Sequence, residues 1–499
     1  MGIDIGTYES KGVITDSSGT VIVYQSCPHT MESPKPGYAE HDAEMIWWGD
    51  FCTLSNGLIS QSGINPADIH AVGCSTIAPC CLPVDEDCNP LRKAILYGVD
   101  VRSGEEIAYL EELFGKDYIL EHYGTPVTSQ SAAAKILWIK NNEEAIYQKT
   151  AKFITGSTYL IAKLTGQYVI DRYTAAAWVP LYDPQAEDWA AENMSLFCRP
   201  DQLAVCRWTN EIGGSITPKA AKETGLAAGT PVSAGTADAA AEAVSAGVFE
   251  PGDMLLMYGS SIFMIQITEK ITPDPRLWSG PYLFPGTFAV TAGMSTAGTL
   301  IRWFRDCLAK DLIEIQRQTG RNAYDLLADE SRDIPPGSDG LIVLPYFSGE
   351  RTPINDPLAK GVVFGLNLCH SRAHIFNACL EGIGYGVAQH FDIFDEKQMP
   401  IHKVMAVGGG VKNEKWLQII SNICGRIQHT VLEGSGAAYG DALLAAHAIR
   451  YYKDMSEIGK IIKHKKTVIP DMEIFRQYAI CKKKYADLYQ STRKIMHTI

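Results

Sequence analysis

The amino-acid sequence predicts an α/β protein with at least two domains. At 499 residues the chain exceeds the size of one ordinary hydrophobic core. Short apolar segments bounded by polar, Gly-containing turns alternate with segments whose apolar residues recur at helical spacing. One strand–turn–strand pattern occurs near the N-terminus and a similar one near the middle of the chain. This weak internal repeat indicates two domains of similar architecture that face each other.

The first 24 residues predict a β-meander. Residues 1–3, 12–15 and 20–24 are short apolar segments, and the polar residues 16–19 provide a turn. The second pattern has strands over 253–258 and 262–267, separated by Gly259, Ser260 and Ser261.

Helical patterns occupy much of the chain between these two strand patterns. They are expected over residues 44–59, 132–140 and 239–246, the last ended by Gly247. Residues 249–252 contain Pro-Gly and come directly before the second meander. We therefore place the domains at 1–248 and 249–499. Within the second domain, strands are expected over 341–345 and 403–407, and the basic C-terminal segment is expected to be a helical packing face.

Composition and charge exclude several classes of protein. Hydrophobic residues make up 46% of the chain and charged residues 20%, as in globular proteins. The formal charge of −13 disfavours binding to nucleic-acid backbones and anionic membranes, because both would be repelled. No apolar run approaches the roughly 20 residues that a membrane span requires. Asp4, Glu9 and Lys11 interrupt the N-terminal segment, so we expect no signal peptide and a cytoplasmic location.

The 13 cysteines include no C-x-x-C pair. Cys74, Cys80, Cys81 and Cys88 are close in sequence but lack the spacing of a zinc site or a disulfide framework. We expect buried thiols in a reducing compartment. A thiol- or metal-dependent hydrolase built on this group has no base or ligand spacing to support it.

The first meander carries a motif that suits a phosphate. Asp4 lies at a strand end and is followed by Gly6 and Thr7. A tight Gly turn directs successive N–H groups at a phosphate, and the carboxylate can hold Mg²⁺ through water. An ordinary hairpin explains the same residues equally well. Ser260 and Ser261 repeat the arrangement, which favours a nucleotide site.

Two glycine-rich segments follow in the second half. Residues 407–410 and Asn413 form a strand, a turn and a helix start, which suits either a nucleotide base or a purely structural turn. Residues 434–440 resemble a dinucleotide fingerprint, but the spacing is wrong and helix packing explains them better. No G-x-x-x-x-G-K-[S/T] motif occurs, so an ATP site here is not a P-loop.

Asp238 follows the strand-like segment 230–234 at the start of a helix. Helix capping is the interpretation that the local sequence favours. The alternative is proton acceptance from a substrate hydroxyl during phosphoryl transfer.

Taken in order along nearly the whole chain, these residues resemble the FGGY carbohydrate kinases and, within them, the xylulokinase-like branch. Leu344-Pro-Tyr-Phe-Ser-Gly-Glu-Arg-Thr-Pro353, continued by residues 360–366, is similar to that branch's pattern. Residues 361–381 fit the second family signature except at Cys379. Lys135-Ile-Leu-Trp138-Ile fits the later part of the first signature.

The resemblance implies two actin-like, ribonuclease H-like ATPase domains with a cleft between them. It implies ATP-dependent phosphorylation of a hydroxyl on a small sugar, namely a ketose such as xylulose or a related alditol or sugar acid. Asp238 then becomes the catalytic base, and Asp4 and Asp238 the Mg²⁺ ligands. The residues that the resemblance places at the nucleotide are Gly6, Thr7, Lys11, Ser260, Ser261, Gly298, Gly409, Gly410 and Asn413.

The substrate segment departs from the family pattern. Thr76-Ile77-Ala78-Pro79 stands where xylulokinases have a polar Gly-Gln-Met-His run. The family's aromatic-Asp-x-Arg segment has one extra residue here, and Ala239 follows the catalytic aspartate where relatives have Asn or Gln. We expect a substrate site lined by Ala78, Pro79, Asp100, Arg102 and Asp238 that takes a different sugar. A binding protein that has lost turnover remains the alternative, and a homodimer stays open.

Overall fold

The computed structural model describes residues 1–432 and 436–499, which form two compact units. Unit 1 contains Met1–Pro251, Ile267–Val290 and Glu433–Lys463. Unit 2 contains Gly252–Gln266, Thr291–Leu432 and His464–Ile499. The chain therefore passes from one unit to the other more than once. The predicted boundary between residues 248 and 249 and the predicted cleft stay predictions.

The main sheet of unit 1 has the strand order β15-β5-β1-β2-β3. Its strands are β1 (Gly2–Ile5), β2 (Glu9–Thr15), β3 (Val21–Pro28), β5 (Gly73–Thr76) and β15 (Thr236–Ala237). Strands β1, β2 and β3 pair antiparallel, so the predicted meander is confirmed. Strands β1, β5 and β15 run parallel, and their carboxyl ends therefore meet at one edge of the sheet.

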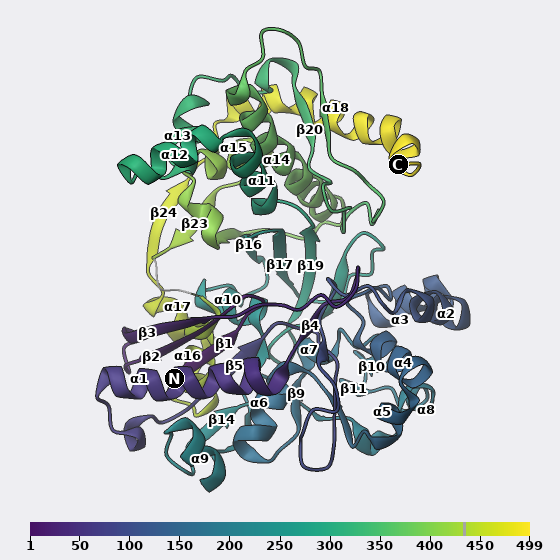
Figure 1. Cartoon of the computed structure of the whole chain (residues 1–499), viewed down its shortest axis with the longest axis vertical. Coiled ribbons are helices and arrows are strands. Elements are labelled where there is room, and N and C mark those ends of the chain that lie inside the picture. The colour runs from purple at the N-terminus through teal and green to yellow at the C-terminus, as the bar shows by residue number, and fades with distance from the viewer. Residues whose placement is uncertain (433–435) are drawn as a thin grey trace. The chain divides into compact units, whose positions relative to one another are not determined.

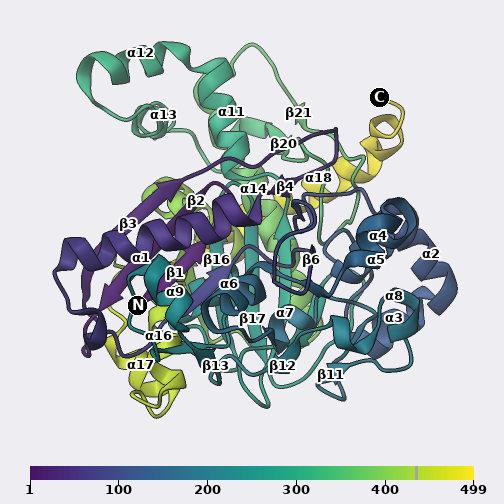
Figure 2. The same ribbon diagram turned by 60° about the horizontal axis from the view of Figure 1, so that its bottom comes forward.

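Helices α1 (Gly49–Ser62) and α16 (Ala437–Ala448) cover opposite faces of this sheet. A Cβ added at Gly12 would meet Leu54 and Leu58 of α1, whereas one added at Gly2 would meet the backbone of α16. Gly12 of β2 is the partner of Ile3 of β1, so these two residues face the same side of the sheet. Gly2 is next to Ile3 in β1 and therefore faces the opposite side. Figures 1 and 2 show α1 lying along strands β1 to β3. A π-helical segment, Ala43–Trp48, precedes α1, and together they account for the helix predicted over 44–59.

Helix α16 also packs closely against α10 (Asp238–Ser245), the helix that begins at the predicted catalytic residue. A Cβ built on Gly440 would lie 1.8 Å from the carbonyl oxygen of Ala241 and 2.6 Å from its carbonyl carbon. Both atoms belong to the backbone of α10, so a side-chain rotation cannot relieve the contact. Glycine at position 440 thus sets the distance between the two helices.

Replacing Gly440 with alanine is expected to lower the free energy of unfolding by about 1–3 kcal/mol, because the added methyl group overpacks a backbone contact. The matched control is Gly104→Ala at the first position of α2, where a Cβ has no heavy atom within 4 Å. Thermal unfolding of the two variants checks this. Equal melting temperatures for both variants would contradict the close packing of α10 against α16.

Unit 2 is built on a second sheet, in which β19, β17, β16, β22, β23 and β24 are neighbours in that order. The bounds are β16 (Asp253–Tyr258), β17 (Ile262–Thr268), β19 (Phe288–Met294), β22 (Lys403–Val407), β23 (Gln428–Val431) and β24 (His464–Val468). Strands β16 and β17 pair antiparallel around Gly259–Ser261, which confirms the second predicted strand pair. Strand β22 runs parallel to both β16 and β23.

Three long helices complete the core of unit 2: α14 (Arg372–Glu396), α15 (Glu414–Cys424) and α18 (Met472–Met496). Helix α15 packs against α14 and α18, as Figure 1 shows. The basic C-terminal segment forms β24 and α18, and α18 buries Tyr478, Tyr485 and Tyr489. This agrees with its prediction as a helical packing face.

The other elements flank the two sheets, apart from β18 (Trp278–Pro281), which lies next to β19 at the edge of the second sheet. The remaining helices are α2 (Gly104–Phe114), α3 (Lys116–Tyr123), α4 (Ala132–Asn142), α5 (Glu144–Lys149), α6 (Gly156–Thr165), α7 (Arg172–Ala175), α8 (Met194–Phe197), α9 (Pro218–Thr224), α11 (Gly298–Leu308), α12 (Lys310–Thr319), α13 (Ala323–Glu330) and α17 (Met455–Ile461). The remaining strands are β4 (Glu40–His41), β6 (Leu82–Val84), β7 (Ala94–Ile95), β8 (Lys152–Ile154), β9 (Val169–Asp171), β10 (Tyr182–Asp183), β11 (Asp188–Trp189), β12 (Val205–Arg207), β13 (Ile212–Ser215), β14 (Pro231–Ser233), β18 (Trp278–Pro281), β20 (Ile342–Leu344) and β21 (Val362–Phe364).

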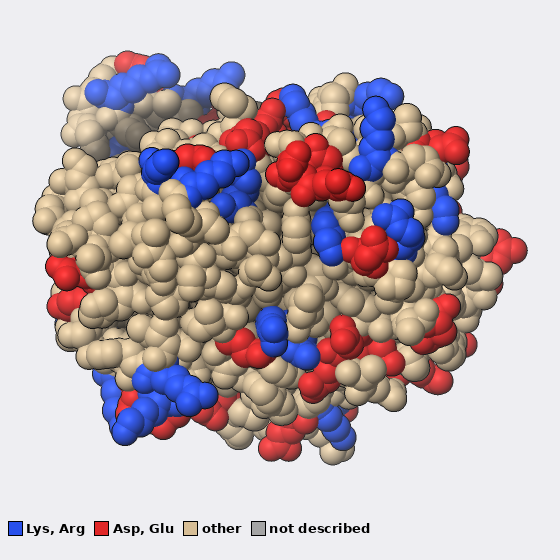
Figure 3. All heavy atoms as spheres, turned by 90° about the horizontal axis from the view of Figure 1, so that it is seen from below, with Lys and Arg blue, Asp and Glu red and all other residues tan. Residues whose placement is uncertain are grey.

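The state of the cysteines, the distribution of surface charge and the character of the helices can be compared with what the composition predicts. Within the described residues, all thirteen cysteines are free thiols, and Cys74, Cys80, Cys81 and Cys88 are buried as predicted. Burial raises the pKa of the Cys81 thiol to about 12, which makes it a poor nucleophile at neutral pH. On the face seen in Figure 3, acidic and basic side chains are interspersed. Over the described part of the chain, no helix combines the length and the apolar character that crossing a bilayer requires.

Candidate active site

The carboxyl edge of the sheet in unit 1 brings three predicted segments together. Gly6 and Thr7 follow β1, Ala78 and Pro79 follow β5, and Asp238 follows β15. The register aligns the strand ends, since Ile5 is the partner of Thr76 and Thr76 is the partner of Ala237. In open α/β sheets, ligands bind outside the carboxyl ends of parallel strands. The topology thus makes this edge the candidate site of unit 1.

Asp238 is the first residue of α10, and the N-cap position belongs to Ala237. One carboxylate oxygen of Asp238 accepts a hydrogen bond of 2.8 Å from the N–H of Ala239. The capping interpretation is therefore only partly right, because the bond is made to the adjacent amide and not from the N-cap position. Burial raises the pKa of Asp238 to about 7, and the nearby carboxylate of Glu242 adds to the rise. A pKa near the working pH suits a general base.

Asp4 lies beside Asp238 in the same acidic cluster. Its side chain is buried, and burial together with the negative charge of Asp238 raises its pKa well above the usual range. The ammonium group of Lys11 acts in the opposite direction. Lys11 also contacts Glu9, with an Nζ to Oε2 distance of 3.4 Å. Buried carboxylates that lie close together repel each other, and one lysine offsets only part of this repulsion. A bound cation would therefore stabilise their ionised forms.

The donor set fits Mg²⁺. Within residues 1–432 and 436–499, no three or more His, Cys, Asp or Glu side chains converge into a ready-made metal cage. Mg²⁺ does not require one, because it keeps several waters and binds through one or two carboxylates plus substrate phosphates. Asp4 and Asp238 are the carboxylates that would hold it.

A buried hydroxyl links Asp4 to a third carboxyl group. The Oγ of Ser75 lies 3.1 Å from Oδ1 of Asp4 and 2.7 Å from Oδ2 of Asp441. A hydroxyl has one hydrogen, so it cannot donate to both carboxylates at once. Both contacts are hydrogen bonds when Asp441 is protonated and donates to Ser75, which then donates to Asp4. Burial raises the pKa of Asp441 well above its usual range, in agreement with a neutral acid.

The predicted nucleotide residues of unit 2 lie at two backbone turns. In the first, Gly298 opens α11, and its N–H donates to the carbonyl of Gly259 at 3.1 Å. The carbonyl of Ser260 accepts from the N–H groups of Ala297 and Thr299, both at 3.0 Å. A Cβ at Gly298 would lie 2.4 Å from the oxygen of Gly259, so only glycine permits this approach. The turn with Ser260 and Ser261 is thus tied to the start of α11.

The second turn follows β22. Gly408 has a φ of +91°, and a Cβ at Gly410 would meet the rings of Trp416 and the side chain of Tyr258. A Cβ at Gly409 has no heavy atom within 4 Å. Asn413 is the N-cap of α15 and accepts from the N–H of Trp416 at 3.1 Å, so its structural role is confirmed. A nucleotide role for these residues stays a prediction. In the similar segment 434–440, residues 434 and 435 lie outside the described residues, and Ala437–Gly440 belong to α16.

The predicted substrate residues Asp100 and Arg102 form a buried ion pair. Nη2 of Arg102 lies 2.7 Å from Asp100 and 2.8 Å from Glu40. Asp100 also accepts from the N–H of Ala39 at 2.6 Å. The guanidinium group lies 4.0 Å from the ring centre of Tyr38. These contacts give both residues a structural role, and contact with substrate stays a prediction for each.

Several residues of this site were not identified from the sequence. Glu242 could have been identified from the sequence, because it lies four residues after Asp238 on the same helix face. Asp441 had a weak signal, as the lone carboxylate in the small-residue helix α16. No sequence signal pointed to His29 and His41, which contact the carbonyls of the first phosphate loop, or to Asp50, which contacts His29.

Comparison with known proteins identifies the family of the two regions. The model for the N-terminal domain of the FGGY family of carbohydrate kinases matches residues 1–245. The model for the C-terminal domain of the same family matches residues 254–449.

Individual relatives match over most of their length. The chain is 27% identical over 502 residues to the xylulose kinase of Bacillus subtilis (strain 168), covering 99% of this chain and 97% of that protein. It is 29% identical over 426 residues to the gluconokinase of the same strain, covering 85% and 82%. The crystal structure of xylulose kinase from Rhodospirillum rubrum superposes with a TM-score of 0.90 at 28% identity, covering 99% of each chain.

Proposed function

The chain belongs to the FGGY family of carbohydrate kinases, and we propose that it transfers phosphate from ATP to a hydroxyl of a small neutral sugar, with Asp238 as the general base. The observation that carries the proposal is the shared carboxyl edge of β1, β5 and β15. This edge brings the Gly6–Thr7 turn, the Ala78–Pro79 segment and the carboxylate of Asp238 together.

The residues at this edge have different roles in phosphoryl transfer. Asp238 accepts the proton of the attacking hydroxyl, and its raised pKa of about 7 matches that task. The Gly6–Thr7 turn holds the phosphates through the N–H groups of Thr7 and Tyr8, because the N–H of Gly6 donates to the carbonyl of Glu9 at 3.2 Å, and Lys11 adds positive charge. Asp4 and Asp238 would hold Mg²⁺, which supplies charge that neutralises phosphate oxygens. The transition state is loose and highly charged, so positioning accounts for most of the catalysis.

The contacts of the cations favour a neutral sugar over a sugar acid. Binding a sugar carboxylate requires a cation that is not already committed to another acid. Arg102 is paired with Asp100 and Glu40, and Lys11 is already assigned to the phosphates. The Ala78–Pro79 segment brings no charged side chain, and proline lacks an N–H donor. We therefore propose a neutral sugar, and the similarity to xylulose kinases makes xylulose the first candidate.

A panel of ketopentoses, ketohexoses, alditols and sugar acids with coupled detection of ADP tests this assignment. We expect kcat/KM for one neutral ketose to exceed that for gluconate by at least about tenfold, since an unpaired carboxylate is costly to bury. Gluconate as the best substrate would overturn the choice of a neutral sugar. Thermal stabilisation by a sugar without any phosphorylated product would instead identify a binding protein.

The proposal includes three finer points. Mg²⁺ is the metal ion that we expect in the reaction. A cytoplasmic location agrees with the use of ATP and with the free thiols. A homodimer stays a prediction.

A further inference from the structure

Two histidine rings lie against the carbonyl groups of the first phosphate loop. Nε2 of His29 is 3.0 Å from the carbonyl oxygen of Gly6, and Nε2 of His41 is 3.1 Å from that of Thr7. A carbonyl oxygen only accepts hydrogen bonds, so both Nε2 atoms carry a hydrogen. The two rings meet edge to face, with their centres 5.2 Å apart. The loop is therefore held from one side by a pair of imidazole donors.

The partner of Nδ1 decides the charge of His41. This nitrogen lies 3.1 Å from Nε1 of Trp47, and an indole N–H only donates. Nδ1 of His41 is therefore an acceptor without hydrogen, and the ring is neutral. Burial lowers the pKa of His41 to about 4, which agrees with this tautomer.

The contacts of His29 require a different protonation. Its Nδ1 lies 2.8 Å from Oδ2 of Asp50, while its Nε2 donates to Gly6. Asp50 also accepts from the hydroxyl of Ser10 at 2.7 Å and from the thiol of Cys27 at 3.5 Å. Because the Nε2 hydrogen is committed to Gly6, the short contact between Nδ1 and Oδ2 is a hydrogen bond only if a second hydrogen lies between them, and we place it on Nδ1. Both ring nitrogens of His29 then carry hydrogen, and the ring is an imidazolium paired with Asp50.

The orientation of these peptides directs two amides away from the histidines. In a planar trans peptide the C=O and the N–H point in opposite directions. Because the carbonyls of Gly6 and Thr7 point at the histidines, the N–H groups of Thr7 and Tyr8 point to the other side of the loop. Neither N–H donates a hydrogen bond to another described residue. Two successive free amides form a concavity suited to a phosphate oxygen.

We propose that His29 is a positioning residue for the nucleotide phosphates. Its imidazolium, held by Asp50, orients the peptide that follows Gly6 so that the amide of Thr7 faces a phosphate group. The charge on the ring polarises that peptide and makes its N–H a stronger donor. The neutral ring of His41 orients the peptide that follows Thr7 in the same way, through its hydrogen bond to the carbonyl of Thr7. This inference rests on the proposed function, which assigns the Gly6–Thr7 turn to the phosphates of ATP.

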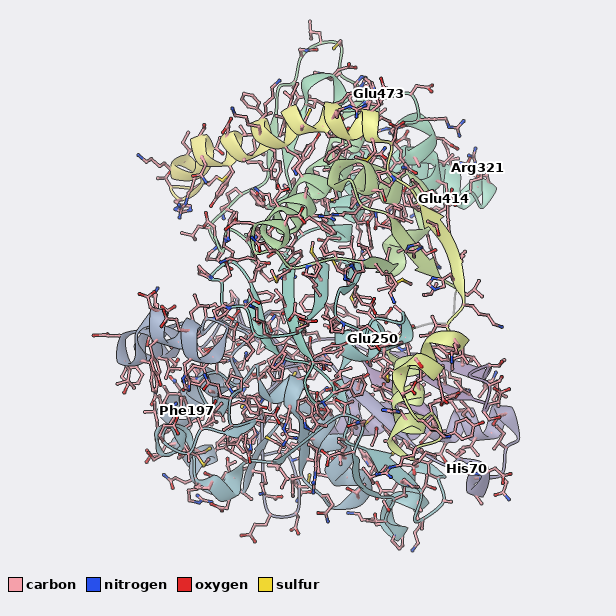
Figure 4. The ribbon with its side chains drawn as sticks, turned by 180° about the vertical axis from the view of Figure 1, so that it is seen from behind. His70, Phe197, Glu250, Arg321, Glu414 and Glu473 are labelled. Atoms are coloured by element: carbon pink, nitrogen blue, oxygen red, sulfur yellow. The ribbon has the colours of Figure 1, made fainter. Side chains whose placement is uncertain are left out.

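The test compares His29→Gln with His70→Gln, a histidine that is exposed in the same unit (Figure 4). We expect His29→Gln to raise KM for ATP about 5- to 20-fold, the usual cost of one charge-assisted hydrogen bond. KM for the sugar should change by less than about twofold, and kcat by less than about threefold. The control should match the wild type in all three. A change in KM for the sugar without a change in KM for ATP would overturn the proposal.

Two further variants separate this inference from the proposed function. Asp50→Asn keeps the shape of the partner and removes its charge, so it should raise KM for ATP in the same direction. Gly6→Ala places a Cβ 2.7 Å from the carbonyl oxygen of Glu9 and distorts the loop itself. If Gly6→Ala raises KM for ATP and His29→Gln does not, only the role of His29 is wrong. If neither does, the phosphate loop was misassigned.

A spectroscopic measurement on the unaltered protein covers the case in which a variant fails to fold. Selective ¹⁵N labelling of the 12 histidines reports the protonation of each ring nitrogen. We expect a histidine signal with both nitrogens protonated at the pH of the assay, assigned to His29 by its absence in His29→Gln or, where that variant does not fold, by its change in Asp50→Asn. A neutral tautomer at His29 would overturn the charged role.

Discussion

Replacing Asp238 with asparagine is expected to lower kcat for the sugar by about 10²- to 10⁴-fold, the usual contribution of a general base. Asparagine keeps the shape of the side chain, and its carbonyl oxygen can still accept from the N–H of Ala239. The start of α10 should therefore survive, while the acceptor for the substrate proton is lost. Steady-state kinetics with the best sugar of the panel measures the effect.

The control for this variant is Asp117→Asn, an exposed aspartate in the first turn of α3. It removes the same charge from the same kind of helix position, and it should keep wild-type kcat. The pH profile gives an independent check, because only the ionised carboxylate accepts a proton. kcat/KM should fall as the pH drops through the pKa of Asp238, about 7, and level off above it. Full turnover in Asp238→Asn would remove Asp238 as the base.

Replacing Asp4 with asparagine is expected to lower kcat on the order of 10²-fold and to raise the Mg²⁺ concentration needed for half-maximal activity. Asparagine preserves an acceptor for the hydroxyl of Ser75, which donates to Asp4 at 3.1 Å. The change therefore removes charge while leaving the local packing intact. Titration of activity with Mg²⁺ at saturating ATP separates the loss of metal affinity from the loss of turnover.

Asp16→Asn, in the turn between β2 and β3, is the matched control for Asp4→Asn. Asp16 is exposed, and its Oδ1 accepts from the N–H groups of Ser18 and Thr20. Asparagine can retain these bonds, so neither kcat nor the Mg²⁺ requirement should change. An unchanged Mg²⁺ requirement in Asp4→Asn as well would show that Asp4 does not hold the metal ion.

Local patterns predicted most of the elements that carry the site. The meander of β1 to β3 and the pair β16–β17 are joined by short polar turns, so neighbouring residues determine them. The helix that begins at Asp238 was predicted for the same reason. Local patterns did not predict the role of Asp238 as a base, because a carboxylate at a helix start is also a common capping arrangement. Only the family pattern along the whole chain favoured catalysis, and the parallel edge of β1, β5 and β15 supports it.

The chemical environment of the site depends on contacts between distant parts of the chain. Ser75 and Asp441 are 366 positions apart and meet because α16 packs against the sheet of unit 1. His29 reaches Gly6 across 23 positions and Asp50 across 21. Spacing within a motif has no bearing on such pairs, and composition does not identify them.

By itself, the sequence determined the α/β class, the paired meanders, the kinase family pattern and the position of Asp238 at a helix start. These properties follow from hydrophobic periodicity, turn residues and motif order, which are local in the chain. Only the tertiary structure decided that Asp100 and Arg102 are paired with each other and that two histidines contact the phosphate loop. Burial, charge pairing and proton placement depend on which surfaces pack together, and that packing is a property of the folded chain.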